Sequence, residues 1–506
     1  MRLAEDFPIT IKKSIGDYTD FKVVAYRLPM PLILLLQAIT SLIVLRNTAF
    51  QDEALYLFAG RQVILNWFGK APYLEPYGLY FSGYPFFYPV IGGALDFLDG
   101  LEAARLFSLL CMLIVTVCVY RMTAQFFERQ SALVAAFLFA CEGSVLFLGR
   151  LATYDALCFC LFALAALLAL RASKATSAQS CLALGPLLMF AVAAKYAGLL
   201  FVPTILALLA LWSWKHKGLE EMLVRLGIAL FSLVASGFIA YFSIDKQVLV
   251  GLSVTTTNRV GDGATAAMVI GHIATMEGLF FGLALLGLLF CRGRRLLGLL
   301  LFGSALLVPI YHTYKGELIS LDKHLAFSMF FLAPLAGFTL ASLARWGWKR
   351  VGRFSWGIAL AFCLLTLSLG LQQARNLYSV WPASTQLTTF LYTRVQDNSG
   401  NYLAEDYDVL RYYLKDKTAP WQWSSLDYFV YTDKEKKVLS GEAAYQAAIQ
   451  EGYFSLIEFS YGYHTPLAMQ LTQTLNASKH YDLIAKIPIH TSYGSGYYWV
   501  WSKHGG

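Results

Sequence analysis

The sequence predicts a polytopic α-helical membrane protein with a small α/β domain at its C-terminal end. Hydrophobic residues make up 57% of the 506 residues and charged residues only 14%, whereas soluble domains are about a quarter charged. Apolar windows of roughly bilayer-spanning length follow one another as far as residue 371. Beyond residue 384, short strand-like and helix-like runs alternate instead. These observations favour an integral membrane protein over a soluble one.

About 11 spans are expected, and up to about 13 with other divisions of the short windows, since one span needs roughly 20 residues. The windows lie near residues 28–45, 102–122, 131–148, 156–171, 181–194, 197–213, 222–243, 271–291, 296–312, 324–343 and 354–371. We therefore predict a short N-terminal segment (1–27), a membrane module (28–371) and an α/β domain (372–506). The run after Arg27 lacks a small-residue cleavage site and is expected to remain as a span.

Positive charge predicts the topology. Basic runs occur in alternate connecting segments, at KHK (215–217), RGRR (292–295) and RWGWKRVGR (345–353), and such runs mark the cytoplasmic side. The N-terminus is therefore predicted to be cytoplasmic in the plasma or inner membrane. Loops 46–101, 244–270 and 313–323, together with the C-terminal domain, are predicted to be extracytoplasmic.

The C-terminal domain is expected to alternate strands and helices. Strands are predicted at NYLAE, YFVYT, FSLIEF, YDLIAKIPI and YYWVW, and helices at DYDVLRYYLK, GEAAYQAAIQEG and TPLAMQLTQTLNA. The run SYGSGYY (492–498) is interpreted as a hairpin turn. With no G-x-G-x-x-G motif opening a helix and no Walker-type loop, the sequence does not favour nucleotide binding.

The cysteines and the net charge exclude further classes. All eight cysteines lie in apolar runs, so neither a disulfide framework nor a cysteine metal site is predicted. The net charge of +8 is accounted for by topology, and no nucleic-acid partner is expected.

Asp52 and Glu53 follow the first span directly. Asp52 is expected to cap a helix that contains Glu53 in its first turn. A carboxylate at the membrane surface is also suited to act as a general base toward a hydroxyl group. The two interpretations are compatible, because a capped position is also a rigid one.

Further charged residues are predicted at the same membrane level. Arg150 and Asp155 occur in the second outer turn, where Asp155 can cap a helix and Arg150 can anchor at the interface. Lys195 lies between two short apolar helices, where it either extends toward water or meets an anion. The fourth outer turn contains His312, Lys315, Lys323 and His324. A basic cluster beside carboxylates at the lipid–water boundary suits a lipid phosphate.

The order of these motifs resembles the GT-C superfamily of membrane glycosyltransferases, above all the protein O-mannosyltransferases and the lipid A aminoarabinose transferases. The resemblance covers most of residues 28–345. The motifs are DEALY (52–56), P-x-x-x-P (85–89) before ARLFSLL, RLATYDAL (150–157), AAKYAGLLFVP (193–203) and DKHLAFSMFFLAPLAG (322–337).

The resemblance implies roles for individual residues. The general base falls on Asp52 with Glu53 beside it, the second acidic residue on Asp155, and the lysine that contacts the donor phosphate on Lys195. The late span often opens with Arg-Tyr in the family but with His324-Leu here, which leaves the phosphate contact open between Lys323 and His324. The full set of predicted donor-phosphate contacts is Lys195, Arg150, Lys315, Lys323 and His324. The predicted acceptor or sugar contacts are Tyr56, Tyr84, Tyr154, Arg259 and His312.

The predicted activity is inverting transfer of a monosaccharide, a hexose or a pentose, from a polyprenyl-phosphate carrier to an acceptor hydroxyl in the cell envelope. The lipid-linked sugar is a substrate, so no cofactor and no metal are required, because lysines would meet the charge on the leaving phosphate. A lipid or solute transporter is the alternative, although the polar residues collect at one membrane face and no inverted repeat is apparent. A non-catalytic assembly subunit is a third alternative. The sequence leaves the sugar, the acceptor and the oligomeric state open.

Overall fold

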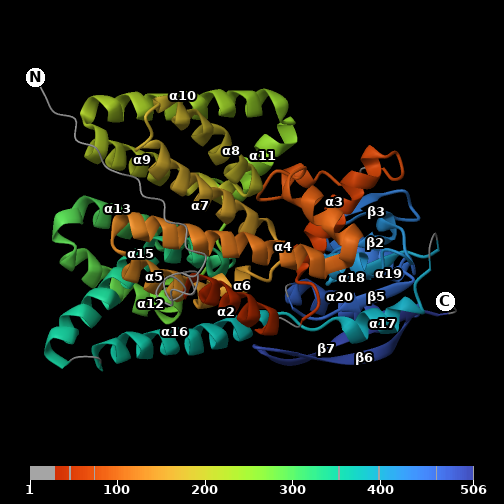
Figure 1. Cartoon of the computed structure of the whole chain (residues 1–506). Coiled ribbons are helices and arrows are strands. Elements are labelled where there is room, and N and C mark those ends of the chain that lie inside the picture. Colours follow the sequence, from red (N-terminus) through yellow and green to blue (C-terminus); the bar gives the residue numbers. More distant parts are fainter. Residues whose placement is uncertain are drawn as a thin grey trace, which may run out of the picture.

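The computed structural model describes residues 29–44, 47–72, 75–351, 354–396, 399–462 and 464–504. Side chains of residues 347–351 and 354–356 are not described. The predicted cytoplasmic segment 1–27 lies outside the described residues. Figure 1 shows a bundle of long helices with an α/β part at one end, next to α3 (Gln51–Trp67).

Eight described helical segments are long and apolar enough to cross a membrane. They are Tyr88–Phe126, Tyr154–Ala172, Tyr196–Lys217, Leu219–Ser243, Ala266–Phe290, Arg292–Lys315, Leu321–Trp346 and Gly357–Tyr378. Three shorter apolar helices are Pro29–Val44, Arg129–Ala140 and Ala178–Ala194. The predicted class of a polytopic helical membrane protein is confirmed, and the count of about 11 spans holds only approximately because three of the helices are short.

The bounds of the individual helices show where the apolar windows are interrupted. The helices of the bundle are α2 (Pro29–Val44), α3 (Gln51–Trp67), η1 (Tyr77–Leu79), α4 (Tyr88–Phe126), α5 (Arg129–Ala140), α6 (Gly143–Leu148), α7 (Tyr154–Ala172), η2 (Ala178–Ala183), α8 (Leu184–Ala194), η3 (Tyr196–Phe201), α9 (Val202–Lys217), α10 (Leu219–Ser243), α11 (Lys246–Thr255), α12 (Ala266–Phe290), η4 (Arg292–Arg294), α13 (Arg295–Ala305), α14 (Leu307–Lys315), α15 (Leu321–Val351) and α16 (Phe354–Tyr378). The regions predicted as outer loops thus contain α3, the start of α4, and α11.

The kink in α4 is located at Asp99 and Gly100. Gly100 has φ 63°, a left-handed conformation that glycine adopts without the steric penalty of a side chain. The kink separates the first part of α4, which packs on α3, from the long apolar part that continues through the bundle.

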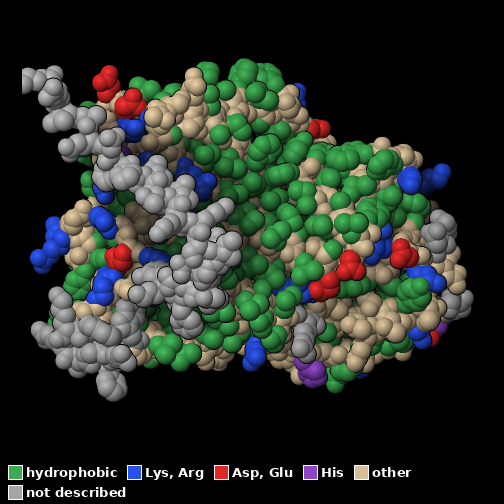
Figure 2. Space-filling view, viewed as in Figure 1, with side chains coloured by type: hydrophobic (Ala, Val, Ile, Leu, Met, Phe, Trp, Pro, Cys, Tyr) green, Lys and Arg blue, Asp and Glu red, His purple; other side chains and the backbone are tan. Residues whose placement is uncertain are grey.

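Helix α15 is the central helix of the bundle. It is buried along almost all of its apolar length, whereas α10 exposes most of its apolar side chains. Phe327 of α15 stacks on Phe201 of η3 and on Phe159 of α7. In Figure 2, apolar side chains cover much of the visible surface of the helices, as a lipid-facing surface requires.

The α/β part contains a five-stranded sheet in the order β2-β1-β5-β7-β6 and a separate two-stranded sheet β3-β4. The strands are β1 (Tyr402–Ala404), β2 (Trp423–Ser424), β3 (Val430–Thr432), β4 (Val438–Ser440), β5 (Leu456–Phe459), β6 (Tyr481–Thr491) and β7 (Gly494–Lys503). The helices are α17 (Thr385–Tyr392), α18 (Tyr407–Tyr413), η5 (Pro420–Gln422), α19 (Glu442–Gln450) and α20 (Thr465–Ala477). Strand β1 is parallel to β2 and β5, whereas β7 is antiparallel to β5 and β6.

The five predicted strands and three predicted helices of this part are observed, and SYGSGYY forms the β6–β7 turn. Strands β2 and β4, of two and three residues, were not predicted.

Helix α18 joins the α/β part to the bundle by packing on α3. The backbone N–H of Ala49 donates to the hydroxyl of Tyr413 (2.8 Å), and the Tyr412 hydroxyl donates to Asp96 of α4. Arg411 pairs with Glu75. The α/β part therefore contacts the segment that leads into α3, which carries Asp52.

Candidate active site

The start of α3 differs from the predicted cap. Phe50 is the N-cap residue and the helix begins at Gln51, so the prediction that Asp52 caps the helix is wrong. Glu53 replaces it, because its carboxylate accepts a hydrogen bond from the backbone N–H of Phe50 (2.8 Å). Asp52 is thereby left free to point elsewhere, and its side chain is about one-third exposed, at 31%.

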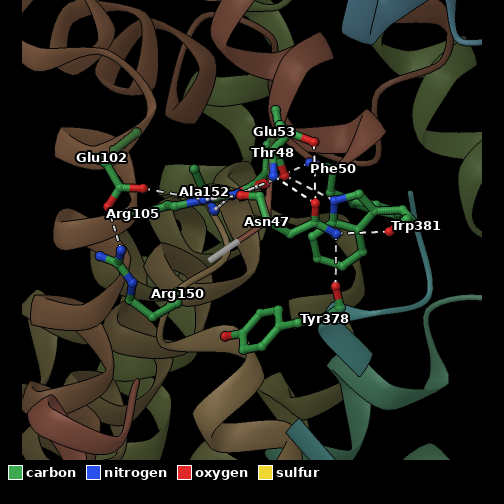
Figure 3. A network of polar contacts seen from close by, with 12 residues as sticks. Asn47, Thr48, Phe50, Glu53, Glu102, Arg105, Arg150, Ala152, Tyr378 and Trp381 are labelled. Carbon is green, nitrogen blue, oxygen red and sulfur yellow. Dashed lines mark hydrogen bonds and ion pairs between the residues drawn. The ribbon is translucent and has the colours of Figure 1, made fainter. Parts of the chain in front are cut away.

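Glu53 is the centre of a buried network (Figure 3). Arg105 donates to both carboxylate oxygens of Glu53, at 2.9 and 2.7 Å, and the backbone N–H of Ala152 donates at 2.7 Å. Arg105 also donates to the carbonyl oxygens of Asn47 and Thr48. The network ties the turn before α3 to the turn before α7, and it uses both oxygens of Glu53.

Asp52 forms an ion pair with Lys323 of α15, with 2.6 Å between Oδ2 and Nζ. The two residues are 271 positions apart in the chain. Phe327, one helical turn after Lys323, packs against Phe159 and Phe201. This aromatic packing positions Lys323 relative to the segments that follow Thr153 and Lys195.

Asp155 forms the second ion pair of the site, with Lys195. Asp155 lies in the first turn of α7 and accepts a hydrogen bond from Thr153, the N-cap residue (2.9 Å). Lys195 lies between α8 and η3 and has an extended backbone conformation. The segment 82–84 lies against it, since a side chain at Gly83 would collide with the carbonyl of Ala194.

The two ion pairs lie close enough together to interact electrostatically. The ammonium group of Lys323 attracts the carboxylate of Asp155 and repels the ammonium group of Lys195. Tyr56 donates to the hydroxyl of Tyr154 (2.7 Å), and both tyrosines are neighbours of the two carboxylates. We call the residues Asp52, Lys323, Asp155 and Lys195 the paired-charge site. Its charges balance, as buried charges require.

Two histidines lie beside the paired-charge site. His312 of α14 and His324 of α15 are joined by a hydrogen bond of 2.8 Å, and both rings are electrostatic neighbours of Lys195. The other ring nitrogen of His312 contacts the carbonyl oxygen of Glu317 (2.9 Å).

An ion pair and hydrogen bonds connect the turn that contains Glu317 to the loop after α11. Arg259 of that loop pairs with the Glu317 carboxylate, and Asp262 accepts hydrogen bonds from the backbone of Leu318 and Ile319. Burial raises the pKa of Glu317 above its usual range, although Arg259 opposes the rise. Lys315 donates to carbonyl oxygens of the same loop.

Not every predicted residue reaches the paired-charge site. Arg150 pairs with Glu102 on the far side of the Glu53 network (Figure 3). Lys315 and Arg259 are engaged by the loop and the turn described above. Tyr84 contributes its backbone N–H to Ala193 (2.7 Å), and its ring packs on Phe86.

Arg105, which holds Glu53, was not among the predicted site residues. Its signal was available, because Arg105 is a cation inside the predicted 102–122 span, where a charge needs a partner. Glu317 gave no such signal, since its role depends on the carbonyl oxygen of its backbone.

Comparisons with known proteins agree with this architecture. Residues 92–241 match a family model described as dolichyl-phosphate-mannose-protein mannosyltransferase. No curated protein sequence matches the chain. The archaeal oligosaccharyltransferase AglB from Archaeoglobus fulgidus, in complex with an inhibitory peptide and a dolichol-phosphate, is 13% identical with a TM-score of 0.56, over 92% of this chain and 74% of AglB. ArnT from Cupriavidus metallidurans, bound to undecaprenyl phosphate, is 12% identical with a TM-score of 0.56, over 93% of this chain and 97% of ArnT.

The chain therefore has the fold of the GT-C superfamily of membrane glycosyltransferases, and this prediction from the motif order is confirmed. The structural likeness extends over nearly the whole chain, so it includes the C-terminal α/β part. At identities this low the solved structures define the fold alone, and the roles of individual residues follow from the chemistry of the site.

Proposed function

We propose that this protein is an inverting glycosyltransferase that moves one monosaccharide from a polyprenyl-phosphate carrier to an acceptor hydroxyl. The observation that carries the proposal is the paired-charge site, in which two carboxylates and two ammonium groups from four separate segments meet within a GT-C fold. Such a site provides a base for a hydroxyl group and cations for a leaving phosphate.

Asp52 is the proposed general base. Its Oδ2 pairs with Lys323, and its side chain is the more exposed of the two carboxylates in the site. Asp52 takes the proton of the acceptor hydroxyl while the acceptor oxygen attacks the anomeric carbon. The bond from that carbon to the phosphate oxygen breaks, and attack opposite the leaving group inverts the configuration.

Lys195 and Lys323 are the proposed contacts of the donor phosphate. The carboxylates neutralise these buried cations. A phosphate that enters takes over part of this pairing, which leaves Asp52 available as a base. The negative charge that develops on the leaving polyprenyl phosphate is then stabilised by fixed cations.

Glu53 and Arg150 are assigned supporting roles. Glu53 has both oxygens engaged by Arg105 and by backbone N–H groups, so it holds the turn that presents Asp52. Arg150 fixes Glu102 on the other side of the same network. Asp155 holds Lys195 in place.

The proposed donor class agrees with the lipid phosphates bound by the structural relatives, dolichol-phosphate in AglB and undecaprenyl phosphate in ArnT. Metal independence remains a prediction, and one A. fulgidus oligosaccharyltransferase structure is a complex with zinc and sulfate. Among the described residues, no group of three or more His, Cys, Asp or Glu side chains is placed to hold a metal ion.

The protein is an integral membrane protein, and we propose that the paired-charge site faces the extracytoplasmic side. Lys and Arg side chains gather at the end of the bundle opposite the α/β part (Figure 2), including those in the last turn of α9 and in η4. A basic cytoplasmic end is expected from the distribution of positive charge.

A donor screen tests the proposal. Purified protein in lipid nanodiscs is incubated with polyprenyl-phosphate mannose, glucose, N-acetylglucosamine or aminoarabinose and with cell-envelope extract as the source of acceptor. Mass spectrometry follows both the release of polyprenyl phosphate and the glycosylated product, with and without EDTA. We expect EDTA-resistant turnover of one donor. Movement of lipid across liposome membranes with no sugar transfer from any donor would instead support the transporter alternative.

A further inference from the structure

The hydrogen bonds of His312 and His324 define which ring nitrogen carries a proton. A carbonyl oxygen only accepts hydrogen bonds, so the contact between His312 Nδ1 and the Glu317 carbonyl requires a proton on Nδ1 of His312. In the neutral ring, Nε2 of His312 then carries a lone pair. That nitrogen faces Nδ1 of His324, which must therefore donate.

The same reasoning assigns the protonation of Nε2 of His324, the last nitrogen in this series of hydrogen bonds. With its proton on Nδ1, neutral His324 has a lone pair on Nε2. This nitrogen is buried and has no hydrogen-bond partner among the described residues. A buried polar atom without a partner is unfavourable, which points to a ligand as the missing partner.

The surroundings of His324 favour a neutral ring. Its electrostatic neighbours are the cations Lys195, Lys323 and Arg259 together with His312, and a further positive charge beside them would be repelled. A neutral ring with Nδ1 already used cannot donate a hydrogen bond to a phosphate from Nε2. It can accept one from a hydroxyl group.

We propose that Nε2 of His324 accepts a hydrogen bond from a hydroxyl group of the donor sugar, with His312 and the Glu317 carbonyl holding the acceptor tautomer. This inference rests on the proposed function. Among the charged groups around His324, Lys195 has the strongest electrostatic effect on the ring. Lys195 is also a proposed contact of the donor phosphate. The sugar is bonded directly to that phosphate, which brings its hydroxyl groups near His324, and hydroxyl groups can donate where the phosphate oxygens only accept.

Two substitutions of His324 distinguish the contributions of its two ring nitrogens. The amide nitrogen of Asn in His324→Asn lies about where Nδ1 lies, so this variant keeps the donor to His312 and loses the acceptor. The terminal amide of Gln in His324→Gln reaches about the position of Nε2 and can accept. His324→Arg supplies a cation instead, as a phosphate contact would require.

The experiment measures kcat/KM with the active donor, and thermal unfolding reports on folding. Deoxy analogues of the same donor, each lacking one sugar hydroxyl, are compared in wild-type and variant proteins. We expect His324→Asn to lower kcat/KM about 10-fold, with His324→Gln less affected and His324→Arg not rescued. One deoxy donor should be about 10-fold poorer with wild type and no poorer than the parent donor with His324→Asn. Binding of undecaprenyl phosphate, which carries no sugar, should be unchanged.

Two results would overturn the inference while wild-type transfer persists. One is weaker binding of undecaprenyl phosphate by His324→Asn with restoration by His324→Arg, which would make His324 a phosphate contact. The other is wild-type kcat/KM for every variant and donor. If His324→Asn unfolds, His312→Asn keeps the bond to Glu317 and removes the partner of His324, and it should weaken the same deoxy-donor discrimination. A wild-type protein that transfers no sugar overturns the proposed function first, and this assignment with it.

Discussion

Asp52 and Glu53 are adjacent in the chain, yet their carboxylates lie in very different surroundings. Glu53 is fully buried and receives hydrogen bonds from Arg105, Phe50 and Ala152. Asp52 is partly exposed and pairs with Lys323. A carboxylate whose lone pairs are all used cannot accept a substrate proton, whereas one held by a single ion pair retains that capacity. Under the proposed function, Glu53 therefore holds the turn that presents Asp52, and Asp52 is the carboxylate that reacts.

The largest effect is expected from Asp52→Asn. If Asp52 is the general base, its loss should lower kcat by about 10²- to 10⁴-fold, while thermal unfolding changes little because the side chain is partly exposed. Turnover and unfolding are measured on the same preparation. Activity close to that of wild type would remove Asp52 as the base and end the contrast with Glu53.

Arg105→Met should affect stability instead. Removing one member of a buried ion pair costs about 3–5 kcal/mol, because Glu53 would stay buried without its partner. The matched control is Arg345→Met, since Arg345 pairs with Glu128 where both side chains are exposed, and its loss should cost about 0–1 kcal/mol. The midpoint of denaturation reports the difference, and equal effects of both variants would contradict the assigned role of the Glu53 network.

Lys323→Met tests whether the available ion pair binds phosphate. Loss of a charge-assisted hydrogen bond should weaken binding of undecaprenyl phosphate by about 10- to 150-fold, corresponding to about 1.5–3 kcal/mol. Lys174→Met is the control, because Lys174 follows the opposite end of α7 and is exposed. Tryptophan fluorescence titrations measure both. Equal affinities of the two variants would show that Lys323 does not contact the phosphate.

Neighbouring carboxyl groups of the α/β part also differ in their surroundings, as Asp52 and Glu53 do. Glu405 accepts hydrogen bonds from the backbone N–H groups of Ser460, Tyr461, Gly462 and His464. Burial, aided by the neighbouring Glu405, raises the pKa of Asp406 to about 7, and burial also raises that of Glu458.

These raised pKa values predict a pH dependence of local stability. A carboxyl group whose pKa is higher in the folded state contributes its full stabilisation below about pH 4 and loses it as the pH rises to about 7. Opening of β1 and β5 should therefore become easier across this range, by up to ~1.4 kcal/mol per pH unit. Backbone amide hydrogen exchange of residues 402–406 and 456–460, corrected for intrinsic rates, measures the free energy of this opening at each pH. Asp406→Asn should flatten the profile, and an unchanged slope would contradict the assignment.

Much of the fold could be predicted because its signals are local. Long apolar windows predicted α4, α7, α10, α12, α15 and α16, since a span reports itself by composition. The interruptions at Asp99–Gly100 and at Glu142 were not predicted. Glu142 instead caps α6 by accepting from the backbone of Ser144 and Val145, and a carboxylate in an apolar run does not reveal whether it caps a helix or serves a site.

Sequence by itself determined the class of the protein: which segments cross the membrane, the alternating strands and helices of the C-terminal part, and the order of charged turns typical of GT-C enzymes. Only the tertiary structure decided how the charges pair. Asp52 meets Lys323 across 271 positions, Glu53 meets Arg105, and His312 orients His324. Hydropathy acts on each segment alone, whereas ion pairs and tautomers depend on distances that exist only once α3, α4, α7 and α15 have packed together.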